Sequence, residues 1–196
     1  MRSTRRIRSL PTSALPALAL AGLSTVGSAD AVAAQDLSCR LQGATMAEAE
    51  ARPSPLRTVE FSFDGGQGLL CYGAPSARGR DIMGGLVPYG QPWRTGANEP
   101  TTIHLSAPAT IGGVEVAAGS YAIYTIPGES AWEVIINPNH ERWGIPINDA
   151  VRATEIGSFT VNPVTLDDAV EMLTFSAADG GLAMEWENTR IVISIG

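Results

Sequence analysis

The chain has 196 residues, with 13 basic and 20 acidic side chains, and its formal net charge is −7. All the basic residues are arginines, and no run of them is interleaved with aromatic residues. An acidic field of this kind repels phosphate backbones, so composition and charge argue against nucleic-acid binding.

The first residues carry the pattern of a secretory signal peptide. Four arginines precede an apolar run at residues 14–26, and small residues with a cleavage pattern ending at Ala33 or Ala34 follow. The run is shorter than the roughly 20 residues that span a bilayer. We therefore expect an exported protein, periplasmic or secreted, with no stable membrane insertion after cleavage. Removing residues 1–34 leaves nine basic and nineteen acidic residues, a charge of 9 − 19 = −10.

The remaining 162 residues (196 − 34) suffice for one domain with a hydrophobic core and are too few for two domains of ordinary size. We predict a linker at residues 35–56, with a short helical piece that Pro53 and Pro55 follow. A single domain at residues 57–196 completes the predicted organisation.

Two cysteines, Cys39 and Cys71, lie in the predicted mature chain. In an oxidising compartment pairing is the default expectation, and two free thiols are the alternative. A bridge across their separation of 32 residues would stabilise the fold by about 3.7 kcal/mol in the chain-entropy description.

Strand patterns dominate after residue 57. Val59, Phe61 and Phe63 alternate with polar residues, and Asp64–Gly66 form a turn into the apolar run at residues 67–73. Further strands are predicted at 101–106, 109–116 with Gly112 and Gly113 as a two-residue turn, 117–126, 131–137, 153–161, 169–176, 181–187 and 190–196. Asp179–Gly181 and Asn188 are the predicted turns between the last three strands, and residues 147–152 are predicted to form one helical turn.

Eight to ten short strands with frequent turns and almost no helical periodicity predict an all-β fold. The expected architecture is an antiparallel β-sandwich or jelly-roll-like domain. No fixed-period repeat is present, which argues against a propeller or solenoid.

Residues 74–100 form a long irregular segment rich in glycine. Its apolar residues are too numerous for disorder, so we predict an ordered, packed loop. Arg78 and Arg80 lie in this segment. They would form an anion pocket if they converged with Arg94, and would otherwise pair with acids such as Asp81.

The sequence lacks the short motifs of common catalytic and cofactor sites, among them G-x-S-x-G, G-x-x-x-x-G-K, H-E-x-x-H and C-x-x-C. It contains two histidines, His104 and His140, whereas a catalytic zinc site commonly uses three protein ligands. A shared site would require the two segments to meet. We therefore expect neither a metal nor a cofactor.

The stretch YGQPWRTGANE at residues 89–99 is the best candidate for a binding site. Trp93 offers a flat apolar face, Arg94 a fork for a carboxylate or phosphate, and Asn98 and Glu99 offer hydrogen bonds. Acid–base chemistry there would be carried out by Glu99 or His104. In the structural alternative, Trp93 fills the core, Arg94 pairs with an acid such as Glu99, and Asn98 bonds the backbone of its own turn.

The same stretch, with AGSYAIYTIPG, WEVIIN, the Trp143-Gly144 pair and the closing MEWENTRIVISI, resembles the bacterial domain of unknown function 2911 family. The similarity extends from about Arg52 to the C-terminus. It implies an exported, β-rich protein of the bacterial envelope, and it implies no activity or catalytic residues. Pro100 departs from the family pattern, which more often has a small residue such as Ala there.

Three functions are compatible with these residues. The first is binding of a small ligand or an envelope partner through the Tyr89–Glu99 loop. The second is a hydrolase-like enzyme that uses Glu99 and His104, with His140 and a metal as further possibilities. The third is a purely structural secreted domain. They differ in whether Arg94, Glu99 and His104 point into one pocket that reaches solvent.

Overall fold

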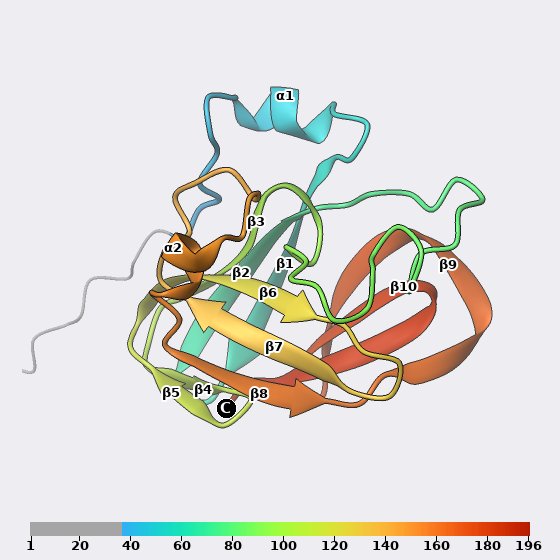
Figure 1. The fold of residues 1–196 in the computed structure, drawn as a ribbon. Helices are drawn as coiled ribbons and strands as arrows, with labels where there is room; N and C mark the ends of the chain where they lie inside the picture. The colour runs from blue at the N-terminus through green and yellow to red at the C-terminus, as the bar shows by residue number, and fades with distance from the viewer. Residues whose placement is uncertain (1–36) are drawn as a thin grey trace, which may run out of the picture. The chain divides into compact units, whose positions relative to one another are not determined.

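The computed structural model describes residues 37–196, and the predicted signal peptide lies outside the described residues. The described residues belong to one unit, Ala34–Gly196. In chain order the elements are α1 (Met46–Glu50), β1 (Leu56–Phe63), β2 (Gly66–Gly73), β3 (Ala97–Leu105), β4 (Ala109–Ile111), β5 (Val114–Val116), β6 (Gly119–Ile126), β7 (Trp132–Asn137), α2 (Asp149–Arg152), β8 (Gly157–Val161), β9 (Val164–Ala178) and β10 (Gly181–Ser194) (Figure 1).

A six-stranded antiparallel sheet in the order β1-β2-β3-β6-β7-β8 is the centre of the fold. The long hairpin β9–β10 and the short hairpin β4–β5 form two further antiparallel sheets. These findings confirm the all-β, sandwich-like fold expected from the strand pattern.

One face of the six-stranded sheet, here called the core face, is apolar. Side chains alternate across a strand, so Ile103 and Leu105 of β3 share this face with Val134 and Ile136 of β7. They pack with residues of β9 and β10 in one buried cluster, in which Trp186 of β10 is among the largest fully buried side chains. The β9–β10 hairpin therefore forms the second layer of the sandwich.

The opposite face, here called the outer face, is covered by two stretches without strands. The N-terminal segment (residues 37–55) packs Leu37 and Leu41 near Leu69 and is bonded to the sheet by the disulfide between Cys39 and Cys71. The α2 loop (residues 138–156) lies over β6 and β7. The disulfide confirms the pairing expected for these two cysteines.

The part of the predicted linker that the structure describes therefore lies against the sheet. Its helix α1 begins with a capping box, in which the Thr45 side chain and Glu48 bond each other's backbone N–H groups.

A bulge in β3 positions the candidate site. Cys71 pairs with Thr102 and Gly73 pairs with Ala97, so two steps along β2 match five steps along β3. The three extra residues, Asn98 to Pro100, arch out of the sheet, and Asn98 has a φ of 63°. This arch is the reason why simple alternation does not relate Glu99 to His104.

Most of the predicted turns are confirmed. Asp64-Gly65, Gly112-Gly113 and Asp179-Gly180 each connect two paired strands, and both residues of the Gly112-Gly113 turn have positive φ as a type I′ turn requires. The turn predicted at Asn188 is wrong. β10 continues through it with two register shifts, and the Asn188 side chain bonds the Leu166 carbonyl of β9 instead.

The irregular segment after β2 is ordered and packed, as predicted. Ile82 and Val87 are buried in the core cluster, and backbone bonds from Leu86 to Asp81 and from Gly84 to Val87 close its turns. Within residues 37–196, no helix has the length and apolar character needed to cross a membrane.

Candidate functional site

A pocket of about 340 Å³ lies beside the start of β3, and two of the predicted binding residues, Trp93 and Arg94, line it. Its apolar walls include Trp186 of β10, whose ring stacks on that of Trp93 at 5.9 Å between centroids and 21° between planes. Arg80 is the second cation in the lining, and no Asp or Glu of the described residues contributes to it. The pocket therefore combines flat apolar surface with positive charge.

Arg94 is held without a charged partner. Among residues 37–196 it takes part in no ion pair, and its Nε is buried with no hydrogen-bond partner. The side chain passes close to Gly144 of the α2 loop, where a Cβ would stand 2.5 Å from Arg94 Cδ. Burial lowers the pKa of Arg94 from its usual value, although a guanidinium keeps its charge at neutral pH.

Arg80 is oriented by backbone oxygens and not by Asp81. Its Nε donates to the Ala77 carbonyl at 2.9 Å and its Nη2 to the Ser76 carbonyl at 2.8 Å. A guanidinium has five N–H donors, so these two bonds leave further donors for a ligand. Arg80 and Arg94 both line this pocket, whereas Arg78 does not, and Arg78 Nη2 donates to the Pro53 carbonyl at 3.4 Å.

Trp93 belongs to the core as well as to the pocket. Its backbone exchanges two hydrogen bonds with Thr125 of β6, at 2.7 and 2.9 Å, and its ring meets Trp132 edge-on at 6.2 Å. Two residues on, Thr95 has a φ of 54° and bonds the Thr125 hydroxyl at 3.0 Å. The walls of the pocket are therefore rigidly placed.

Asn98 and Glu99 fasten the N-terminal segment and do not line the pocket. Asn98 Nδ2 donates to the Ser54 carbonyl at 2.9 Å. Glu99 is 7% exposed, and its carboxylate accepts from Arg52 Nη1 at 2.6 Å and from the Gln42 N–H at 3.3 Å. These contacts occupy the groups that were expected to bind a ligand or move a proton.

His104 lies in a different, buried place on the outer face. It is 2% exposed, and its Nδ1 lies 2.7 Å from Ser120 Oγ. Burial lowers the pKa of His104 to about 4, with His140 and Arg40 adding to the shift, so the ring is neutral at pH 7 and a weak base. Among the described residues, no hydrogen bond or ion pair joins it to Glu99.

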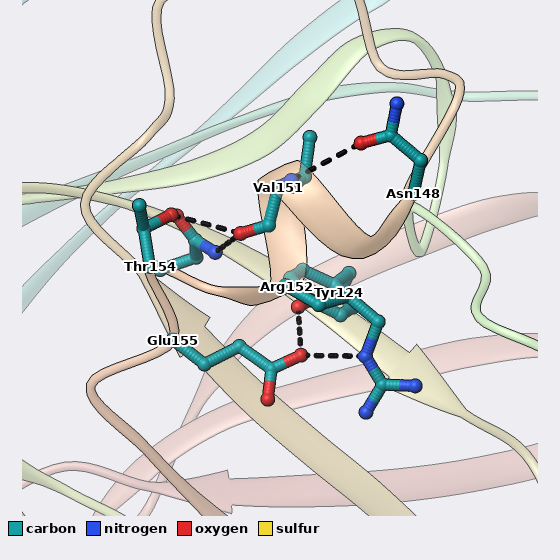
Figure 2. A network of polar contacts seen from close by, with 7 residues as sticks. Tyr124, Asn148, Val151, Arg152, Thr154 and Glu155 are labelled. Atoms are coloured by element: carbon teal, nitrogen blue, oxygen red, sulfur yellow. Dashed lines mark hydrogen bonds and ion pairs between the residues drawn. The ribbon is translucent and has the colours of Figure 1, made fainter.

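A polar network fixes the α2 loop to β6. The Tyr124 hydroxyl donates to Glu155, which also accepts from Arg152 Nε at 2.9 Å, and Asn148 caps α2 through the Val151 N–H (Figure 2). Burial raises the pKa of Tyr124, and its bond to Glu155 adds to the rise. This arrangement explains how the loop that contacts the Arg94 side chain is held in place.

Sequence patterns did not identify two residues of this region, Trp186 of the pocket and Arg52, the partner of Glu99. Alternation along β10 puts Trp186 on one buried face with Leu182 and Met184, but alternation alone cannot show that this ring meets Trp93, which lies far away in the sequence. Arg52 lies in the predicted linker, where no local pattern distinguishes a buried ion-pair partner from an exposed charge.

No set of three or more His, Cys, Asp or Glu side chains within residues 37–196 is grouped to hold a metal ion as the side chains stand. The cationic pocket can bind a ligand, because among residues 37–196 neither of its arginines has a charged partner.

Fold and site together define an all-β, disulfide-bonded domain with an arginine- and tryptophan-lined pocket. The family model described as "Protein of unknown function (DUF2911)" matches residues 54–195, and the chain belongs to this family. No curated protein and no solved structure matches the chain.

Proposed function

We propose that this protein is an exported domain that binds a small anionic ligand with a flat apolar part in the pocket formed by Trp93, Arg94, Arg80 and Trp186. The ligand is either free or a group displayed by an envelope component. Pockets of about 300–1,000 Å³ hold small ligands, and this one has about 340 Å³.

The observation that carries the proposal is the state of Arg94. A buried N–H group without a partner costs about 1–3 kcal/mol, and more when the group is charged. Arg94 Nε is such a group, and among residues 37–196 the guanidinium of Arg94 has no hydrogen bond or ion pair, although the side chain lines a pocket without acids. An anion in this pocket would supply a partner for the remaining N–H groups of the guanidinium.

The two walls define the ligand chemistry. A guanidinium fork matches a carboxylate or a phosphate, and the partly exposed indole ring of Trp93 favours a planar or apolar body. A carboxylate or phosphate monoester attached to a ring fits both requirements. The overall negative charge of the protein leaves Arg80 and Arg94 as a local exception, which gives the pocket selectivity for anions.

The leader pattern and the disulfide support export, since structural disulfides persist in oxidising compartments. A test is to fuse residues 1–36 to a reporter enzyme that is active only outside the cytoplasm. An inactive fusion would contradict export.

Ligand binding is tested with benzoate and phenyl phosphate as probes and neutral benzamide as their matched control. Binding is followed by tryptophan fluorescence and isothermal titration of the purified protein. We expect the two anions to bind and benzamide to bind at least tenfold more weakly, because it lacks the charge that Arg94 requires.

Arg94→Met keeps the apolar stem beside Gly144 and removes the guanidinium. We expect it to abolish the preference for the anions while the melting temperature stays close to that of the wild type. Arg57→Met, at an arginine outside the pocket, is the control and retains binding. Equal binding of benzoate and benzamide, or unchanged binding in Arg94→Met, would favour the purely structural function.

A further inference from the structure

The two histidines of the chain, far apart in the sequence, meet on the outer face outside the lining of the pocket. His104 belongs to β3 and His140 to the α2 loop, and their ring centroids lie 6.4 Å apart at 88° between planes. The proposed function uses neither ring.

Both imidazoles have Nδ1 engaged by oxygen. His140 Nδ1 lies 2.8 Å from the Pro138 carbonyl, which only accepts, so Nδ1 carries the proton and the lone pair is on Nε2. Ser120 Oγ can accept from His104 Nδ1 in the same way. His104 Nε2 is buried and has no partner among the described residues.

This is the ligand state that metal ions require. A ligating imidazole is neutral and commonly donates its other N–H to a carbonyl or a similar oxygen, which fixes its tautomer. Neutral imidazole is a good ligand for zinc, copper and nickel.

A carboxylate is within reach of the pair. Glu141 Oε1 lies 3.9 Å from His140 Nε2, and its side chain is 64% exposed and able to change rotamer. The same oxygen lies 4.0 Å from Arg40 Nε, so Arg40 competes with any cation for this carboxylate. Two rings on a tetrahedral zinc ion have centroids about 5 Å apart with Zn–N bonds of about 2 Å. The α2 loop must therefore bring His140 slightly closer.

We propose that His104 Nε2 and His140 Nε2 bind one divalent first-row transition-metal ion, with Glu141 and solvent completing its coordination. The ion satisfies the unpartnered nitrogen of His104. Solvent access exists on the side of His140, whose side chain is 17% exposed. The site is independent of the anion pocket, and either can exist without the other.

The experiment is a titration of the purified, disulfide-bonded protein with Zn²⁺ alone, followed by ¹⁵N NMR of the imidazoles. The chain contains two histidines, so two rings give all the signals. Before addition, we expect both Nε2 atoms to have the shift of an unprotonated nitrogen. One equivalent of Zn²⁺ should move both Nε2 signals and leave the Nδ1 signals protonated.

His104→Asn and His140→Asn keep a donor near the position of Nδ1 and remove Nε2. Each is expected to weaken Zn²⁺ binding at least tenfold. Arg40→Gln is expected to strengthen it several-fold, because it removes a nearby positive charge and frees Glu141. If His104→Asn fails to fold, His140→Asn still tests the site, because His140 lies on a partly exposed loop.

The proposal is overturned if stoichiometric Zn²⁺ leaves either Nε2 signal unchanged, or if His140→Asn binds Zn²⁺ as tightly as the wild type does. A shift of Nδ1 in place of Nε2 would also overturn it, because the ion would then have displaced the bonds to Ser120 and Pro138.

Discussion

The two faces of the six-stranded sheet are covered by different physical means. The core face buries apolar side chains against β9 and β10, and its cover is another sheet. The outer face buries Thr102, His104, Tyr124 and Asn137 under loops. A disulfide, an ion pair between Arg52 and Glu99, and the bonds around Glu155 fasten that cover.

This difference predicts which face of the sheet is more sensitive to pH and to reductants. Apolar packing responds to volume and temperature and hardly to pH or reductant. A cover held by cystine, carboxylate and neutral imidazole responds to both. The outer face is therefore expected to open first. Among residues 37–196, it also has buried nitrogen atoms without a hydrogen-bond partner on His104 and Arg142.

The largest effect is expected on the core face. Trp186 is 1% exposed and stacks on Trp93, and truncation of a buried tryptophan costs about 3–5 kcal/mol. Trp186→Ala should lower the free energy of unfolding by about 4 kcal/mol in urea titrations. Trp143→Ala is the control, because Trp143 is 44% exposed, and it should cost less than about 1 kcal/mol. Equal losses would mean that the faces do not differ as described.

Removal of the disulfide should rank next. Cys39→Ser combined with Cys71→Ser opens a loop of 32 residues in sequence separation, which corresponds to about 3.7 kcal/mol in the chain-entropy description. Hydrogen exchange should accelerate in the N-terminal segment while the amides of β9 and β10 stay protected. Uniform acceleration over both faces would contradict an outer cover that opens separately.

Acidification should destabilise the protein through His104. Its folded pKa of about 4 lies below the unfolded value of about 6.5, so the unfolded state binds the proton more readily between these values. The contribution of neutral His104 to the free energy of unfolding is fully present above about pH 6.5. It decreases by about 3 kcal/mol as the pH falls towards 4. Unfolding free energies at pH 7, 5.5 and 4 measure it.

His104→Asn is the matched variant for this pH dependence, and its profile should be flatter over that range. His140 and Arg40 also act on this ring, so the variant isolates the contribution of His104 from theirs. An unchanged profile in His104→Asn would assign the acid sensitivity to other groups.

The smallest effect concerns the ion pair that joins Glu99 to Arg52. The side chains of Glu99 and Arg52 are 8% and 20% exposed, which places this ion pair between a surface ion pair and a fully buried one. A double-mutant cycle with Glu99→Gln and Arg52→Gln should therefore give a coupling energy of about 2 kcal/mol. The more exposed pair of Glu185 and Arg190 is the control and should give less than about 1 kcal/mol. A coupling no larger than that of the control would mean that this ion pair does not fasten the cover.

Local patterns were sufficient wherever the physical cause is local. The turn at Gly112-Gly113 follows from positive φ at both residues, which glycine adopts without strain. Alternation along a strand at 181–187 also accounts for the buried face shared by Leu182, Met184 and Trp186. At Asn188 the local pattern failed, because the partner strand β9 accommodates a bulge there and the side chain bonds Leu166.

The candidate site depended on contacts between distant segments. Trp93 and Arg94 were identified as binding candidates from one stretch, but Arg80 and Trp186 join them through packing. Glu99 and His104 were considered together because they are close in sequence. The three-residue arch in β3 and the N-terminal segment give them separate partners.

The sequence by itself determined most of the strands and turns, the buried alternation and the pair of cysteines, because backbone conformation and side-chain periodicity are properties of neighbouring residues. The tertiary structure decided which charges found partners and which did not. How the loops cross the sheet decides three outcomes: Arg52 pairs with Glu99, His104 meets His140, and Arg94 has no charged partner among residues 37–196. Burial gives each of these outcomes a large effect on the free energy, because a buried polar group without a partner is costly.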